Sequence, residues 1–222
     1  MIKKLKTSAL LASTALVMSA PTLAYEAGDI LLRAGTATVS PESSSADIDQ
    51  VPNQAVSAND NTQLGISGTY MLTDKIGVEV LAATPFSHDI TAKDGALNSP
   101  GADIGEIKHL PPTISAQYYL MDAKSPLQPY VGAGLNITIF FDEEAGSTSK
   151  SLGYDKLSLD NSVGLAVQAG LDYNINEEMF VNASIMYAKI GTTATLEGTS
   201  GKLTVDYDLD PMVYRVNFGY KF

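Results

Sequence analysis

The chain ends in the stretch Pro211-Met-Val-Tyr-Arg-Val-Asn-Phe-Gly-Tyr-Lys-Phe222. Its side chains alternate between an apolar set and a set that is mostly small, polar or charged. Successive side chains of a β-strand point to opposite faces of the sheet. The stretch therefore predicts a strand with one face against an apolar phase and the other against a polar interior. The apolar set is Met212, Tyr214, Val216, Phe218, Tyr220 and Phe222, and the opposite set is Val213, Arg215, Asn217, Gly219 and Lys221.

The last residue, Phe222, gives this strand an aromatic terminus. An aromatic residue in that place resembles the carboxyl-terminal signature of bacterial outer-membrane β-barrels. The mean hydropathy of the chain, +0.04, does not exclude a bilayer, because a barrel exposes apolar residues only at every second position. With 222 residues, 18 Gly, 10 Pro and no Cys, the composition fits one β-rich domain held by hydrogen bonds and burial, without disulfides.

The first 24 residues have the pattern of an export signal. A basic start at residues 1–6 precedes an apolar core at 7–18, too short to span a bilayer, and a small-residue cleavage site at 21–24. We therefore expect residues 1–24 to be a cleaved secretory signal peptide, not a retained anchor, and residues 25–222 to be the mature domain. Without the three signal lysines, 11 basic residues face 25 acidic ones, a net charge of −14. That charge argues against nucleic acid as a partner.

Eight stretches of the mature chain alternate like the last one. Each places apolar side chains on one face, and mainly Gly, Ser, Thr, Asn, Gln or charged side chains on the other. Three short turns, at residues 73–75, 121–126 and 174–178, alternate with four long connections. The predicted strands are residues 29–39, 63–72, 76–84, 113–120, 131–141, 162–173, 179–190 and 211–222, and the long connections are residues 40–60, 85–112, 142–161 and 191–210.

This organisation is typical of a transmembrane β-barrel, which has an even number of strands near ten residues long, short turns at one end and long loops at the other. A secreted lipocalin-like barrel also has eight strands. That fold buries apolar side chains inside, whereas here Gly, Asn, Gln and Arg would make a poor dry core. We predict an all-β fold: an eight-stranded antiparallel transmembrane β-barrel with short periplasmic turns and four long extracellular loops.

Six stretches carry a resemblance to a known family: Asn61-Thr-Gln-Leu-Gly65, Gly77-Val-Glu-Val-Leu-Ala-Ala-Thr-Pro-Phe86, His109-Leu-Pro-Pro-Thr113, Pro129-Tyr-Val-Gly-Ala-Gly134, Phe140-Phe-Asp142, and Asp210-Pro with the closing Gly219-Tyr-Lys-Phe222. In this order they resemble the outer membrane protein W family. The resemblance implies a small barrel of the Gram-negative outer membrane that passes small hydrophobic molecules. Family members usually carry Trp in the stretches matching Val163, Met186 and Met212, whereas this chain has no Trp. Its interfacial aromatic belt must therefore consist of Tyr and Phe.

Polar side chains are expected to fill the lower lumen, since eight strands leave an interior just wide enough for side chains. Charged groups in a low-dielectric interior are costly unless they are paired and hydrogen-bonded. We therefore predict a polar plug, structural in role, with a proton or ion relay as the alternative. Its members point inward a few residues from the short-turn ends of their strands: Arg33, Glu79, Gln117, Gln168 and Arg215.

The inward set is apolar nearer the extracellular end, at Leu81, Phe140 and Met186. A hydrophobic molecule entering from outside would stop above the plug, because crossing it would desolvate polar groups without recompense. Sideways exit into the membrane requires a break in the strand ladder, and proline lacks the N–H donor that a ladder needs. The candidates for this lateral opening are Pro85, Pro111 and Pro112.

No motif points to chemistry. The two histidines, His88 and His109, both fall in the long connection 85–112, and no Gly-x-Ser-x-Gly elbow is present. The acidic clusters at 142–144 and 206–210 match no ordered calcium loop. We therefore expect no enzyme, no cofactor and no metal, and a solvated acidic rim around the extracellular end.

Two functions remain open. The first is passive uptake of small hydrophobic molecules, and the second is a filled structural anchor whose extracellular loops act as a receptor or adhesion surface. An ion-conducting pore is a weaker third option, since the narrow lumen would have to be wet. The expected partners are membrane lipid, lipopolysaccharide and small hydrophobic solutes, for a monomeric protein.

Overall fold

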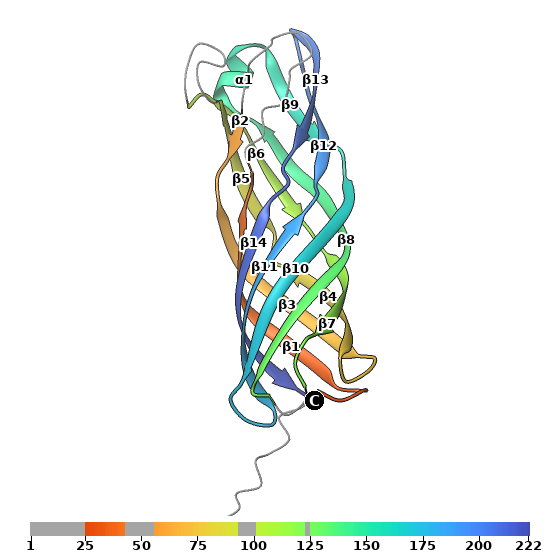
Figure 1. The fold of residues 1–222 in the computed structure, drawn as a ribbon. Helices are drawn as coiled ribbons and strands as arrows, with labels where there is room; N and C mark the ends of the chain where they lie inside the picture. Colours follow the sequence, from red (N-terminus) through yellow and green to blue (C-terminus); the bar gives the residue numbers. More distant parts are fainter. Residues whose placement is uncertain (1–24, 43–55, 93–100, 123–124) are drawn as a thin grey trace, which may run out of the picture.

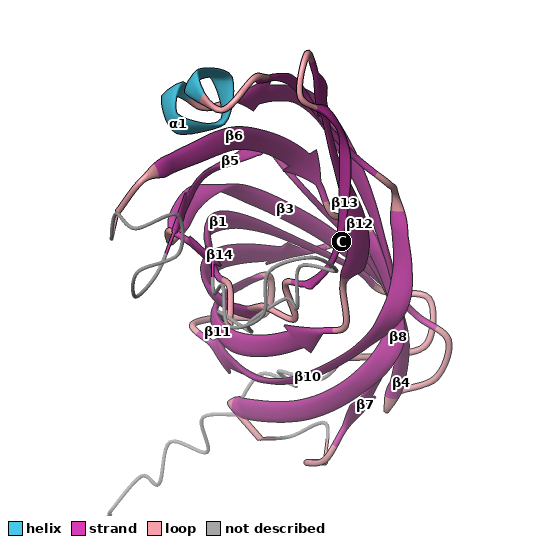
Figure 2. Cartoon of the chain, turned by 90° about the horizontal axis from the view of Figure 1, so that it is seen from above, coloured by secondary structure: helices cyan, strands magenta, loops and turns pink. Residues whose placement is uncertain are grey.

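The computed structural model describes residues 25–42, 56–92, 101–122 and 125–222. Residues 1–24, the predicted signal peptide, lie outside the described residues. Eight strands form one closed antiparallel ring around the barrel axis, as predicted (Figures 1 and 2). Strand β14 closes the ring on β1 through ten residue pairs, from Leu31↔Lys221 to Ser40↔Met212. In ring order the strands are β1 (Ile30–Ser40), β3 (Asn61–Met71), β4 (Ile76–Ala83), β7 (Thr113–Tyr119), β8 (Leu127–Ala145), β10 (Ser162–Asn174), β11 (Met179–Ala188) and β14 (Met212–Lys221).

The outer face of this ring is apolar. Val163, Leu165 and Val216 are 70%, 68% and 64% exposed, and the interior at the same strands holds buried polar side chains such as Gln168 and Arg215. A barrel in water would reverse this arrangement, because exposed apolar surface is unfavourable there. The alternation therefore excludes the lipocalin-like alternative and identifies the outer belt as the lipid-facing surface.

The long connections contain strands and a short helix that were not predicted from the sequence. The connection 85–112 forms a hairpin, β5 (Phe86–Ala92) and β6 (Asp103–Leu110), and β6 pairs with β8. These strands escape the alternation pattern because their outward residues, such as Ser87 and Lys108, are polar above the lipid belt. The remaining elements are β2 (Val56–Ala58), paired with β5; helix α1 (Ser147–Ser151); and a three-stranded sheet of β9 (Tyr154–Leu159), β12 (Gly191–Gly198) and β13 (Gly201–Asp208).

Within the described ranges, no helix has both the length and the apolar character needed to cross a membrane.

The buried interior has three tiers along the barrel axis. An aromatic tier closes the end with the short turns: Tyr25, Leu31, Met71, Tyr119, Tyr130 and Phe180. Glycines make room for its rings, since a Cβ on Gly219 would overlap the ring of Phe180 and one on Gly170 would overlap that of Tyr130. A polar tier follows, and an apolar tier fills the extracellular half. The buried apolar tier consists of Ala37, Val39, Leu81, Phe86, Ile107, Phe140, Ala166, Met186, Ala188, Ile190, Tyr207, Leu209 and Val213.

Candidate functional site in the barrel lumen

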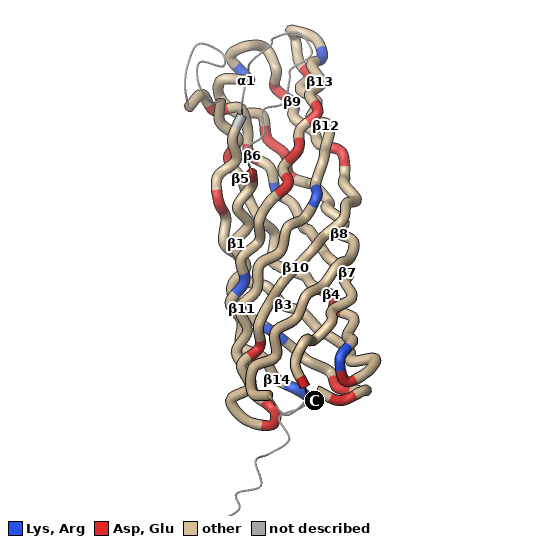
Figure 3. Tube along the Cα trace, in the orientation of Figure 1, with Lys and Arg blue, Asp and Glu red and all other residues tan. Residues whose placement is uncertain are grey.

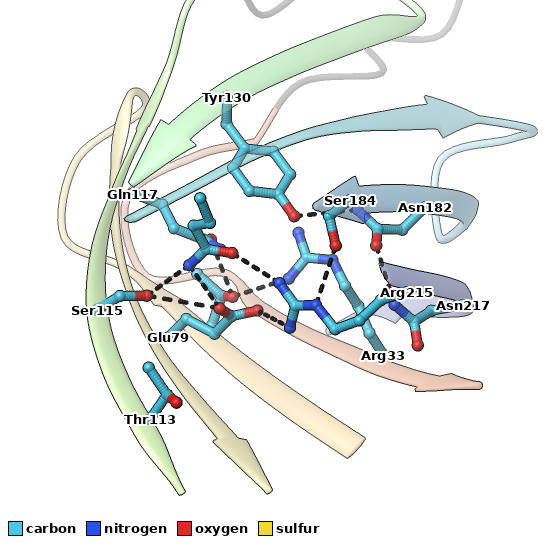
Figure 4. A network of polar contacts seen from close by, with 12 residues as sticks. Arg33, Glu79, Thr113, Ser115, Gln117, Tyr130, Asn182, Ser184, Arg215 and Asn217 are labelled. Carbon is cyan, nitrogen blue, oxygen red and sulfur yellow. Dashed lines mark hydrogen bonds and ion pairs between the residues drawn. The ribbon is translucent and has the colours of Figure 1, made fainter. Parts of the chain in front are cut away.

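One ion pair of the polar tier joins Arg215 on β14 to Glu79 on β4 (Figure 4). The Arg215 Nη1 to Glu79 Oε1 distance is 3.3 Å, and each side chain is 1% exposed. Gln168 bridges the pair: its Oε1 accepts from Arg215 Nη2 at 2.6 Å, and its Nε2 donates to Glu79 Oε2 at 2.8 Å. Arg215 Nε also donates to the Ser184 hydroxyl at 3.0 Å. Both buried charges are therefore paired and hydrogen-bonded, as stability requires.

The second ion pair joins Arg33 on β1 to Asp172 on β10. Arg33 Nη2 lies 2.7 Å from Asp172 Oδ2, and Arg33 Nε lies 3.4 Å from Asp172 Oδ1, so the contact is bidentate. Asp172 also accepts from the Tyr25 hydroxyl at 2.8 Å and from Asn182 Nδ2 at 2.6 Å. The Arg33 guanidinium sits 5.2 Å from the ring centre of Phe180, within cation–π range. This pair therefore rests directly on the aromatic tier.

All five side chains predicted for the plug are buried in the lumen, but they divide between the two pairs. Glu79, Gln168 and Arg215 form the first group. Gln117 belongs to the second, where its Oε1 accepts from Thr69 at 3.2 Å and from Tyr119 at 3.1 Å. We call these five residues together with Asp172 the polar network.

Asp172 was not predicted as a member of the polar plug. Two arginines and one glutamate inside the barrel would leave one positive charge unpaired. A count of the inward charges would therefore have predicted a second buried carboxylate. Asp172 was the candidate, because it shares the inward face of its strand with Gln168.

The apolar tier above the network holds a small cavity of about 20 Å³. Leu81 and Met186 line it, as predicted for the apolar lumen, whereas Phe140 belongs to the tier but not to the cavity wall. A volume of this size admits roughly one water molecule. The other lining residues are Ala37, Val39, Ala82, Ala83, Phe86, His109, Pro111, Asn136, Ala188, Ile190, Pro211 and Val213.

A comparison with known proteins decides the family: the model of the OmpW family matches residues 26–222. The chain belongs to the OmpW family. Outer membrane protein W of Vibrio cholerae is 49% identical over 214 residues, 96% of this chain and 97% of that protein. The crystal structure of the outer membrane protein OprG from Pseudomonas aeruginosa is similar with a TM-score of 0.82 at 42% identity, over 90% of this chain and 98% of that one.

A more distant relative is the Dibenzothiophene metabolism operon protein PahQ of Pseudomonas aeruginosa. It is 27% identical over 175 residues, 78% of this chain and 77% of that protein. The family and the lipid-facing belt together place this OmpW-family barrel in the outer membrane. Its short turns face the periplasm and its long connections face outward.

The predicted lateral opening of this OmpW-family barrel coincides with a break in the strand ladder. The β4–β7 ladder ends at the pair Leu81↔Thr113, and the β5–β6 ladder begins at Phe86↔His109. Neither ladder includes residues 82–85 or 110–112, which contain all three predicted prolines. Of these prolines, Pro111 lines the cavity, whereas Pro85 and Pro112 are not among its lining residues.

A stacked histidine pair lies beside the cavity, in the β5–β6 hairpin where the outward residues Ser87 and Lys108 are polar. His88 Nδ1 is 2.6 Å from the carbonyl oxygen of Asn59, and His88 Nε2 is 3.1 Å from His109 Nε2. The His109 ring also lies between the rings of Phe86 and Phe140, with centroids 5.5 and 5.7 Å away. Burial lowers the pKa of His88, and burial together with the neighbouring His88 lowers the pKa of His109 to about 3, so both imidazoles are neutral at pH 7.

Sequence reasoning gave these histidines no role because both fall in a long connection. The alternation of Phe86, His88 and Ile90 against Ser87, Asp89 and Thr91 is the signal that would have placed His88 inside.

Acidic residues gather at the extracellular end of the barrel and at its periplasmic turns (Figure 3). Asp142 is 68% exposed in its pair with Lys108, and Asp206 accepts from Thr193. Asp210 instead has a structural role, since it accepts from the Tyr187 hydroxyl and the Ile190 amide, each at 2.9 Å. Among the residues that the structure describes, no group of three or more His, Cys, Asp or Glu is arranged to hold a metal ion.

Proposed function

We propose that this outer-membrane barrel takes up small hydrophobic molecules from outside. The solute enters the apolar tier, stops above the polar network and leaves sideways into the membrane. The carrying observation is the reversal of polarity within one lumen: an apolar cavity, lined by Leu81 and Met186, lies above two buried ion pairs.

Straight passage is opposed by the polar network. An apolar solute crossing it would separate charged groups that hold one another at 2.7 and 3.3 Å, and it would offer them no hydrogen bonds in return. The aromatic tier beneath, including the Tyr119 and Tyr130 rings 5.3 Å apart, narrows the path further.

The break in the ladder supports a sideways exit. Ala82, which is exposed on the outer face, also lines the cavity, so the cavity approaches the lipid-facing surface there. The flanking strands keep their other bonds at this point: the Thr84 amide donates to Leu64, and the Ile137 amide donates to Pro112, each at 2.9 Å. Opening between residues 82–85 and 110–112 would therefore sacrifice few backbone hydrogen bonds, which is the main cost of a lateral gate in lipid.

The size of the cavity requires side chains to move when a solute enters. Met186 is suited to this because its unbranched thioether chain has three rotatable bonds. The name of PahQ connects that relative with the metabolism of dibenzothiophene, an apolar aromatic compound. That association supports the same solute class for this chain.

The test is uptake of naphthalene into cells with and without the protein, beside the conductance of the folded barrel in a planar bilayer. We expect protein-dependent uptake with little steady current. Leu81→Glu and Met186→Glu should each cut uptake, since a carboxylate in the apolar tier must be desolvated by the passing solute. Leu152→Glu is the matched control, because Leu152 is 46% exposed after helix α1. Unchanged uptake in both lumen variants, with folded barrels, would refute the proposal.

A filled anchor with a receptor or adhesion surface is the second candidate. The observation that favours it is the small volume of the cavity, about 20 Å³. Equal naphthalene uptake with and without the wild-type protein would select this function instead.

A further inference from the structure

The partners of the histidine pair determine which ring nitrogen carries each proton. The Asn59 carbonyl oxygen can only accept, so His88 Nδ1 carries a hydrogen and donates across 2.6 Å. In a neutral imidazole the other nitrogen is then an acceptor. His88 Nε2 therefore accepts, and His109 Nε2 donates to it across 3.1 Å. This leaves His109 Nδ1 as a lone-pair acceptor.

That acceptor is buried and has no partner. His109 is 2% exposed, and within the described part of the chain its Nδ1 atom makes no hydrogen bond. A buried polar atom without a partner costs free energy and calls for an explanation. His109 also lines the cavity, so its unsatisfied atom belongs to a side chain of the cavity wall.

Two other polar side chains near the cavity, those of Asn136 and Tyr207, are less suited to bind a solute there. The Asn136 side chain, also on the cavity wall, donates to Pro111 and Thr113 and accepts from Thr138. The Tyr207 hydroxyl also has no partner among the described residues, but Tyr207 is not among the lining residues. Among the side chains lining the cavity, His109 is thus the one with a buried polar atom that makes no hydrogen bond within the described part of the chain.

We propose that His109 Nδ1 accepts a hydrogen bond from the transported solute, so that the cavity selects hydrophobic molecules with one O–H or N–H donor, such as phenols and indoles, over hydrocarbons of the same shape. This inference rests on the proposed uptake function and names its solute class.

The discrimination has a general physical basis. A site built to hydrogen-bond a donor rejects an analogue that lacks it, because the buried acceptor of the site is then left unpaired. Phe86 lines the cavity and its ring stacks on His109, with centroids 5.5 Å apart, so it supplies an apolar, aromatic surface for the rest of the solute.

The test compares 2-naphthol with 2-methoxynaphthalene, which has the same ring system and oxygen but no donor. Binding to the folded barrel in lipid nanodiscs is followed by naphthyl fluorescence, since the chain contains no Trp. Empty nanodiscs give the partition background. We expect wild type to bind 2-naphthol about tenfold more tightly than 2-methoxynaphthalene, the usual effect of one hydrogen bond.

Two variants separate the acceptor from the shape of the ring. His109→Phe keeps an aromatic ring but has no acceptor, so the preference should vanish while 2-methoxynaphthalene still binds. His109→Asn places a carbonyl oxygen near the position of Nδ1 and should keep most of the preference. The gel mobility of unheated samples verifies that each variant is folded.

Each outcome bears on a different claim. Equal binding of both probes by wild type, or a preference that persists in His109→Phe, overturns the role of His109 and leaves hydrophobic uptake standing. If neither probe binds wild type above the nanodisc background, the uptake function fails together with this inference.

Discussion

The polar network and the apolar tier fill neighbouring lengths of one lumen by different physical means. In the network, Arg33, Asp172, Glu79 and Arg215 are held by charge-assisted hydrogen bonds, which are directional and specify one geometry. In the apolar tier, side chains such as Leu81 and Met186 are held by hydrophobic contacts, which are non-directional and can re-form around a guest. The difference indicates that directional bonds fix the side-chain geometry at one depth of the lumen, whereas non-directional contacts a few residues above leave room for rearrangement.

Breaking one ion pair should have the largest effect on stability. Asp172→Leu leaves the buried Arg33 charge without its partner, so we expect a loss of about 3–5 kcal/mol. The measurement is urea unfolding of the barrel in lipid. The double variant Arg33→Met with Asp172→Leu removes both charges and should recover most of the loss. A double variant as unstable as the single one would show that the interaction of the charges is not what stabilises the network.

Truncation in the apolar tier should reduce stability less than breaking an ion pair does, and it should increase uptake. Met186→Ala enlarges the cavity, for which we expect a loss of about 2–3 kcal/mol. The same variant should raise naphthalene uptake several-fold, since it widens the place where the solute must fit. Gln168→Ala, in the network, serves as the comparison and should not raise uptake. Faster uptake in Gln168→Ala than in Met186→Ala would reverse the assignment of the two regions.

Acid should destabilise the folded barrel through His109, which is buried beside the apolar tier. The pKa of His109 is about 3 in the folded state and about 6.5 when unfolded, so the unfolded chain binds the proton first as pH falls. Stability is therefore lost progressively between about pH 6.5 and pH 3, and at pH 5 the loss from this residue is about 2 kcal/mol. Melting at pH 7 and pH 5 measures it. His109→Asn, which cannot titrate, should lose that much less, and an identical loss in both proteins would contradict the argument.

An exposed ion pair supplies the smallest effect and the control for the first prediction. Lys75 Nζ lies 3.1 Å from Asp122 Oδ1, but the side chains are 40% and 93% exposed. Surface pairs of this kind contribute about 0–1 kcal/mol. Lys75→Ala should change the free energy of unfolding by about 0.5 kcal/mol or less in the same urea experiment. A loss as large as that of Asp172→Leu would mean that burial does not explain the strength of the network.

The strands of the barrel could be predicted because lipid imposes one rule on the whole outer surface. Val163 and Val216 point outward in the structure, as their positions in the alternation predict. The same rule does not apply above the bilayer, where β5 and β6 expose polar side chains. The β5–β6 hairpin was therefore predicted only as part of a long connection. The depth of a residue along its strand was also predictable. Glu79, Gln168 and Arg215 were expected at similar depth, and in the structure they contact one another.

Partner choice across the lumen could not be read from single strands. The contact of Arg33 with Asp172 depends on how β1 and β10 are staggered around the ring, and no local pattern records that stagger. The histidine pair poses the same problem, because it forms only when the β5–β6 hairpin folds and brings His88 beside His109.

The two ion pairs also constrain how the barrel assembles. Each joins strands that are not neighbours in the ring, β1 with β10 and β4 with β14. A sheet that has not yet closed, or has closed with shifted strands, would hold four charges in the membrane without their partners, at several kcal/mol each. Partly assembled states are therefore penalised until the last strand is in register. The side chains that fill the lower lumen therefore favour the closed ring in its correct register over partly assembled or shifted ones.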